Sequence, residues 1–343
     1  MEDTPLVSRI LRVGYMLAAF ASSQTVWASG ISFTCNSNID TSTCSYLNSN
    51  IAGLYAGIFN TANAQIYIQY GSTGLGQSQQ YYNSTTFNNY LSALTSHEAS
   101  GDATDSSAVA SLQGGEPSIF GGGSIYLTSA LDAALGLSGG LGIDLGLNPC
   151  TLNPNTSNPA CFNGIITISN AQSYYYRTGN ETSGEYDFYS IAEHETDEIL
   201  GTPSCIGTVS SAPHDVCNST GVSPADLFRY SAAGTRSFVS QGNGTTAYFS
   251  VNGGTTSIAA YNNSPNGADY GDWSTSCTHV QDAYGCPGVS LDISSDGGAE
   301  LAVLDAVGYN IANTPEPGTL GLLALGITGI VQIRRRNKRQ TSI

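Results

Sequence analysis

The hydrophobic positions of the chain switch between helical and extended patterns several times in its first part. Apolar residues recur at three- and four-residue spacing over residues 50–62 and again over residues 85–97, which predicts two helices. Between them, residues 64–71 alternate apolar and polar side chains, as a half-buried strand does. Residues 99–123 are rich in Gly, Ser and Asp and predict a linker, whereas residues 124–137 predict a strand and a helix. This alternation favours an α+β domain.

The second part of the chain has fewer regular segments. Residues 164–170 form a short apolar run that predicts a strand, and residues 297–310 have the apolar spacing of a helix. Within this helix we expect Glu300 to be a surface or capping group. Three consecutive tyrosines at residues 174–176 either line a cleft or pack in the interior.

The most concentrated chemistry lies in residues 186–204. On a helix, His194 and Glu198 lie one turn apart on one face, and Glu195 is rotated from His194 by about 100° around the helix axis. In the H-E-x-x-H helix of zinc hydrolases, two histidines hold the metal and the Glu is general base towards the metal-bound water. Here Glu198 stands at the second histidine position, and a carboxylate is also a zinc ligand. The alternative is an acidic first turn that faces solvent.

The frame His194-Glu195-x-x-Glu198-x-x-Gly201-x-x-Ser204 resembles the metzincin signature H-E-x-x-H-x-x-G-x-x-H. Gly201 is retained, where the helix of a metzincin turns sharply. Together with its surroundings, this frame is similar to a group of exported bacterial PEP-CTERM proteins with a zincin-like metalloprotease domain. The segments that carry the likeness are residues 164–170, 186–201, 224–238, 267–273, 280–288 and 304–310.

The resemblance implies an α+β, zincin-like, two-lobed metalloprotease domain with a mixed sheet and an active-site helix. The first lobe would span residues 30–204, and an irregular, disulfide-bearing C-terminal lobe would span residues 205–312. Residues 164–170 take the place of the zincin edge strand, which pairs with an extended substrate peptide. An internal strand is the alternative.

The third metal ligand is not at its usual place, because Ser204 is a poor zinc ligand. We expect Asp272 in that role, since residues 271–285 resemble the segment that carries the third histidine in leishmanolysin-like metzincins. His279 is the runner-up, and His214 and Asp226 are further candidates. Both methionines of the chain lie in its leader, so the methionine of a metzincin Met-turn is absent.

Both ends of the chain have the features of export signals. Residues 1–28 predict a signal peptide, with Arg9 and Arg12 before an apolar run and small residues before the cleavage point. Residues 314–340 combine a Pro-Glu-Pro triplet, a short apolar segment and a basic cluster, which resembles the PEP-CTERM sorting signal. The resemblance implies processing by signal peptidase and exosortase, transient anchoring, and delivery to the cell surface, periplasm or extracellular matrix of a Gram-negative bacterium.

The segment between these signals is strongly acidic. Of ten basic residues, two lie in the leader and five in the tail, so three remain beside 23 of the 26 acidic residues. A net charge near −20 repels nucleic acid and anionic lipid, so we expect neither as a partner. Membrane contact would come only through the C-terminal segment.

All eight cysteines lie in this acidic segment, and their order suggests bridges between neighbours. Sequence alone leaves many connectivities open. The pairs closest in sequence are Cys35 with Cys44, Cys150 with Cys161, Cys205 with Cys217, and Cys277 with Cys286.

Two functions follow from these expectations. The first is a secreted, surface-sorted zinc-dependent endopeptidase that cleaves protein or peptide substrates, with Zn2+ held by His194, Glu198 and Asp272 or His279, and with Glu195 as the catalytic base. The alternative is a catalytically inactive zincin-like relative that binds extracellular matrix or glycans. In that protein the carboxylates would hold no metal, or Ca2+ in place of Zn2+.

Overall fold

The structure is a computed structural model. It describes residues 30–114, 124–137, 140–153, 160–206, 221–238, 246–264, 268–274, 276–295 and 298–312. The predicted signal peptide and the predicted sorting segment lie outside these residues. Of the helices that the structure describes, none is long and apolar enough to cross a membrane.

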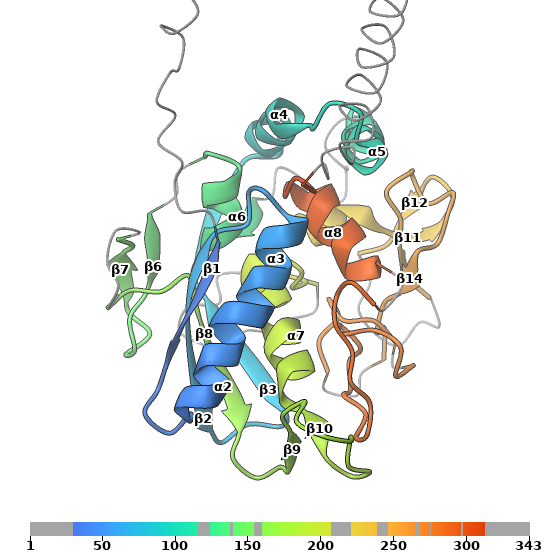
Figure 1. Ribbon diagram of the computed structural model, residues 1–343. Coiled ribbons are helices and arrows are strands. Elements are labelled where there is room, and N and C mark those ends of the chain that lie inside the picture. Colours follow the sequence, from blue (N-terminus) through green and yellow to red (C-terminus); the bar gives the residue numbers. More distant parts are fainter. Residues whose placement is uncertain are drawn as a thin grey trace, which may run out of the picture.

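The main sheet has four strands in the order β1-β2-β8-β3, and it is mixed (Figure 1). β1 (Ile31–Cys35), β2 (Ala64–Gly71) and β8 (Gly164–Ser169) run parallel, whereas β3 (Gly76–Gln80) is antiparallel to β8. The strand predicted at residues 64–71 is therefore confirmed. The prediction that residues 164–170 form the sheet edge is wrong, because β8 is paired on both sides and the edge strand is β3.

Two helical segments lie side by side on one face of this sheet (Figure 1). The first joins β1 to β2 and consists of α2 (Thr41–Tyr46), the π-helical turn η1 (Leu47–Ile51) and α3 (Ala52–Ile58). The second is α7 (Phe188–Leu200), which packs on β3 and β8. The helix expected over residues 50–62 thus begins earlier, because Asp40 caps α2 by accepting hydrogen bonds from Thr43.

A group of shorter elements follows β3 in the chain. The helix predicted at residues 85–97 is confirmed, and so are the strand and helix within residues 124–137. The linker prediction for residues 99–123 is wrong in part, because Asp102 caps a further helix there by accepting from the amides of Thr104 and Asp105. These elements are β4 (Tyr82–Thr85), α4 (Phe87–His97), α5 (Ala103–Leu112), β5 (Ile125–Thr128), α6 (Ser129–Ala134), β6 (Leu141–Ile143) and β7 (Pro149–Thr151).

The C-terminal part of the described chain is largely irregular, with one small antiparallel sheet of order β12-β11-β13-β14. The predicted C-terminal helix is confirmed, and it packs against α5 and α7. The elements of this part are η3 (Ala225–Phe228), β11 (Arg229–Ala232), β12 (Thr235–Arg236), β13 (Tyr248–Phe249), β14 (Ala259–Ala260) and α8 (Ala299–Val307).

Before α7, β9 (Tyr174–Tyr175) pairs with β10 (Tyr186–Asp187). The rings of Tyr174 and Tyr176 pack against Phe188 with centroids 5.9 and 5.3 Å apart, so two of the three consecutive tyrosines serve packing.

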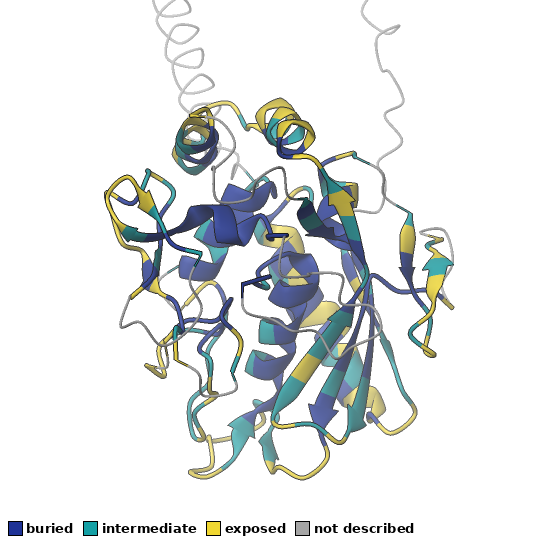
Figure 2. Ribbon diagram, turned by 180° about the vertical axis from the view of Figure 1, so that it is seen from behind, coloured by how far each residue is buried: buried dark blue, intermediate teal, exposed yellow. Residues whose placement is uncertain are grey.

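The largest hydrophobic core connects the N-terminal and C-terminal parts of the described chain. Its buried residues run from Ile31 in β1 to Tyr309 after α8. Figure 2 shows that α7 and α8 are mostly buried, while α4 and α5 carry exposed positions. The α+β class is therefore confirmed.

Three disulfides join the neighbouring cysteines predicted from the sequence: Cys35–Cys44, Cys150–Cys161 and Cys277–Cys286. Cys205 is disulfide-bonded as well, and Cys217 lies outside the described residues. Each of these bridges joins cysteines that are 9 or 11 positions apart, so each closes a short loop.

Candidate functional site

The site is organised around α7, whose two ends are defined by local chemistry. At its start, the Asp187 carboxylate accepts a hydrogen bond from the Tyr189 amide at 3.0 Å. At its end, Gly201 adopts a φ of 144°, a conformation that L side chains rarely adopt, and the Gly201 and Thr202 amides donate to the Asp197 carbonyl. A Cβ at position 201 would also meet Leu131 Cδ2 at 3.1 Å. Gly201 therefore makes the sharp turn that the sequence predicts.

The acidic residues of α7 are buried. Glu193 and Asp197 have no exposed surface, and Glu195 and Glu198 expose 4% and 6%. The alternative of a solvent-facing acidic turn is therefore wrong. Buried carboxylates need partners, so each must serve either the fold or a site.

Glu193 and Asp197 serve the fold. Glu193 accepts a hydrogen bond from the Ile293 amide at 3.0 Å, and it lies 3.7 Å from the Arg177 guanidinium. Asp197 accepts one from the Tyr55 hydroxyl at 2.6 Å. These contacts tie α7 to α3 and to the C-terminal part of the chain.

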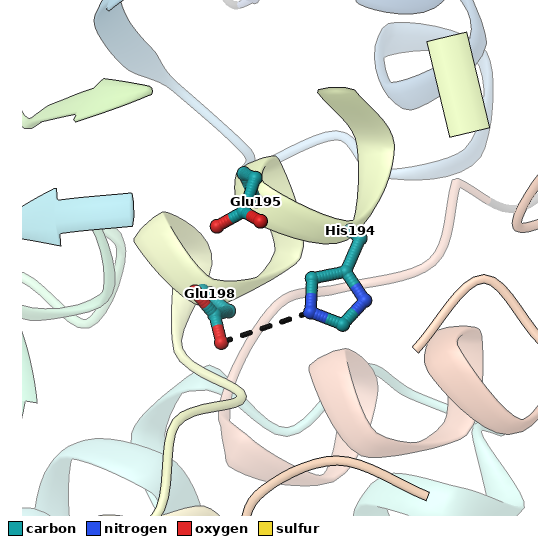
Figure 3. A group of neighbouring side chains, drawn as sticks. All are labelled: His194, Glu195 and Glu198. Carbon is teal, nitrogen blue, oxygen red and sulfur yellow. Dashed lines mark ion pairs between the residues drawn. The ribbon is translucent and has the colours of Figure 1, made fainter. Parts of the chain in front are cut away.

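His194, Glu195 and Glu198 form a compact cluster on another side of α7 (Figure 3). One ligand atom from each lies within 4.8 Å of the others. His194 Nε2 is 3.9 Å from Glu198 Oε1, and these side chains point toward one another from successive turns. The helix therefore brings together the three residues that the sequence singled out.

The imidazole of His194 is held in one orientation. Its Nδ1 donates a hydrogen bond to the Val280 carbonyl at 2.9 Å, which leaves Nε2 as the nitrogen that faces the carboxylates. A carbonyl partner on the far nitrogen is the arrangement typical of histidines that bind a metal. Nε2 therefore faces the carboxylates as an available ligand atom.

Asp272 comes to the same nitrogen from the C-terminal part of the chain. Its Oδ1 lies 3.7 Å from His194 Nε2, and Asp272 is 4% exposed. The Gln281 amide nitrogen lies between them, 3.3 Å from Nε2 and 3.1 Å from Oδ1. The Gln281 Oε1 atom is buried without a hydrogen-bond partner. If the Gln281 side-chain amide were rotated, this oxygen would face the space between His194 and Asp272, where it would serve a cation as a further ligand.

The edge strand β3 closes the other side of the cluster. Gly76 faces Glu195 so closely that a Cβ on Gly76 would lie 2.1 Å from Glu195 Oε1. Two positions along, the Ser78 hydroxyl donates a hydrogen bond to Glu198 Oε2. Gly76 therefore makes room for the Glu195 carboxylate, and Ser78 orients the Glu198 carboxylate.

Burial and crowding of like charges change the proton affinities of the cluster. Burial raises the pKa of Glu195 well above its usual range, and the charge of Glu198 and a hydrogen bond between the two carboxyl groups raise it further. Burial also raises the pKa of Asp272, which His194 partly offsets. For His194, burial lowers the pKa, but the carboxylates of Asp272 and Glu198 outweigh it and the net shift is upward.

These directions indicate excess negative charge, which protons relieve unless a cation is bound. One imidazole nitrogen with several carboxylate oxygens is a donor set that Zn2+ accepts. The residues present therefore fit a divalent metal.

The remaining candidates for the third ligand point elsewhere. Ser204 donates its hydroxyl hydrogen bond to Asp226, which also accepts from the amides of Cys205 and Ser223 at 2.9 Å each. Asp226 thus stabilises the chain after α7. His279 Nδ1 lies 3.9 Å from Glu300 Oε2. His214 lies outside the described residues.

Several residues of the site were not foreseen from the sequence. The prediction of a surface or capping role for Glu300 is wrong, because Glu300 is fully buried. It accepts hydrogen bonds from the Trp273 indole and from the backbone amide of Gln281. It therefore orients the segment that carries Asp272 and Gln281. Gly76 and Ser78 carried no signal in the sequence, since their role depends on which strand forms the edge.

The three arginines between the leader and the tail are all bound internally. Arg177 pairs with Asp187 at 2.7 Å, Arg229 donates to the Tyr270 carbonyl at 2.6 Å, and Arg236 donates to the Leu227 carbonyl at 2.7 Å. The part of the chain that the structure describes therefore offers no cluster of free cations to an anionic partner.

The family comparison matches one segment, the PEP-CTERM protein-sorting motif, over residues 313–336. This match confirms the predicted sorting signal, and it indicates an exported protein that an exosortase processes and sorts to the surface. The comparisons with curated proteins and with solved structures each found no match.

Proposed function

We propose that this exported protein is a zinc-dependent endopeptidase with a zincin-like fold. The observation that carries the proposal is the convergence of His194 Nε2 with the Glu195 and Glu198 carboxylates within 4.8 Å, with Asp272 3.7 Å from the same nitrogen. The mixed sheet, with an antiparallel edge strand beside the helix that carries the motif, supports the resemblance to zincins.

The roles of the residues follow from their contacts. His194, Glu198 and Asp272 would hold Zn2+, with His194 oriented by Val280 and Glu198 by Ser78. When bound, Zn2+ would supply a Lewis acid for the scissile carbonyl and would make a water molecule more acidic. Glu195 would accept the proton of the attacking water at its carboxylate and return it to the leaving amine.

The edge strand supports a peptide as the substrate. β3 pairs with β8 on one side, and no described strand pairs with its other edge. An extended peptide could add to that free edge through backbone hydrogen bonds. Because Gly76 and Ser78 of β3 contact Glu195 and Glu198, a bound peptide bond would lie beside the cluster.

Replacement of Glu195 by glutamine tests the proposal. The variant keeps the shape of the side chain but cannot accept the proton, so we expect hydrolysis of fluorescently labelled casein to fall by at least about 100-fold. Zinc content should stay unchanged, which separates a lost base from a lost metal. Equal hydrolysis by the variant and the parent would exclude Glu195 as the catalytic base.

A binding protein without activity is the second candidate, and one observation favours it. The side-chain amide of Gln281 bridges His194 and Asp272 at hydrogen-bonding distances, so this pair has hydrogen-bond partners without a metal. In that case the parent protein would show no zinc and no casein hydrolysis, and its role would be binding to extracellular matrix or glycans.

A further inference from the structure

A second acidic cluster lies at the opposite end of α8 from Glu300. Asp102 and Asp105 come from the start of α5, and Asp305 comes from the last turns of α8. One carboxylate oxygen of each lies within 4.8 Å of the other two. The cluster therefore joins two helices that are far apart in the sequence.

The oxygens of Asp305 are not satisfied by the protein. Asp305 has no exposed surface, and both of its carboxylate oxygens are buried without a hydrogen-bond partner. The Ile311 amide and the Thr104 hydroxyl lie near enough to the Asp305 carboxyl group to lower its pKa, but they do not offset its burial. A buried carboxylate without partners is costly, so something else must compensate its charge.

The surroundings of Asp305 make its charge still less favourable. It lies near the C-terminus of α8, where the helix dipole is negative. Burial, followed by the charges of Asp105 and Asp102, raises the pKa of Asp305 to about 8, and burial raises that of Asp105 to about 6. All these causes point to a missing positive charge.

The two partners have one hydrogen-bonded oxygen each. Asp102 Oδ1 accepts from the Thr104 amide at 2.8 Å, and Asp105 Oδ2 accepts from the Ala99 amide at 2.7 Å. Both carboxylates are therefore held in place, while each keeps a further oxygen for a ligand.

We propose that Asp102, Asp105 and Asp305 form a Ca2+ site that fastens α8 to α5. The cluster offers only oxygen donors, which favours a hard cation over Zn2+. Asp102 is partly exposed, which leaves room for water molecules in the coordination shell. The ion would neutralise the three charges and stabilise the helix whose other end carries Glu300 of the His194 site.

The experiment uses the full chain after EDTA treatment and measures Tm with and without Ca2+, together with Ca2+ titration calorimetry. At about 100 times Kd we expect Tm to rise by roughly 5 °C. Asp305→Asn should lose at least 10-fold in Ca2+ affinity and most of this rise. In EDTA, at a pH above the Asp305 pKa of about 8, the same variant should be at least as stable as the parent, because it removes a buried charge. If Asp305→Asn does not fold, Asp105→Asn takes its place and should show the same loss of Ca2+ affinity.

Two controls make the result specific. Asp40→Asn also removes one negative charge but keeps a capping residue at α2, so its Ca2+ response should equal that of the parent. His194→Ala should also keep the response. No rise in the parent, an equal rise in Asp305→Asn, or a rise that His194→Ala abolishes would overturn the proposal.

Discussion

Replacement of Gly76 by alanine tests how the edge strand positions the proposed base. A Cβ at this position would lie 2.1 Å from Glu195 Oε1 and 2.8 Å from Ile191 Cγ2. Real Cβ atoms have essentially no neighbours under 3.0 Å, so the Glu195 oxygen must move from 2.1 Å to at least 3.0 Å away. The substitution thus displaces the carboxylate by about 1 Å while leaving its chemistry intact.

Two magnitudes follow from this displacement. Overpacking of this kind costs about 1–3 kcal/mol, and each kcal/mol lowers Tm by roughly 2–4 °C in domains of about 150–250 residues. Misplacement of a catalytic group by about 1 Å lowers kcat/KM by about 100-fold. We therefore expect a folded protein whose activity falls far more than its stability.

Gly74→Ala is the matched control, because a Cβ at Gly74 has no neighbour within 4 Å. Casein hydrolysis and Tm would be measured for the parent and both variants at equal zinc content. Hydrolysis by Gly76→Ala equal to that by Gly74→Ala would refute the placement of Glu195 against β3.

Three further predictions concern other parts of the structure. Tyr55→Phe removes the hydrogen bond to buried Asp197 and should lower the free energy of unfolding by about 1–3 kcal/mol; an unchanged urea midpoint would contradict this. Hydrogen bonds from its neighbours lower the pKa of Asp40 to about 2, so its capping contribution is present above the ordinary value of 3.8 and is lost as pH falls towards 2. The difference in urea midpoint between the parent and Asp40→Asn should therefore change between pH 5 and pH 2, and a constant difference would count against it. Asp272→Asn should weaken zinc binding by at least 10-fold in competition with a chromophoric chelator, whereas His279→Asn should not; the reverse order would make His279 the ligand.

Local patterns were sufficient for much of the fold. The alternation in β2 and the helical spacing in α4 and α8 each reflect one buried face, so a short window of sequence contains the information. α5 was missed because its small and polar residues resemble a linker, although Asp102 provides a cap. The edge position of β3 was missed because strand order depends on contacts that are distant in sequence.

The residues of the site also fall into two groups, those that a local pattern predicts and those that depend on distant contacts. His194, Glu195 and Glu198 were predictable because one helix fixes their spacing. Asp272 was foreseen only through a resemblance, and Gln281, Glu300 and Gly76 were not foreseen. Their roles arise from packing between distant segments, which no local pattern reports.

The most direct test of the metal centre is the zinc content of the full chain, purified without a metal-binding tag. Zinc would be measured by mass spectrometry after the protein is loaded with zinc and dialysed. We expect about one zinc per chain in the parent and in Glu195→Gln, and less than about a tenth of that in His194→Ala. A parent protein without zinc, or a His194→Ala variant that retains zinc fully, would show that these residues do not form a zinc site.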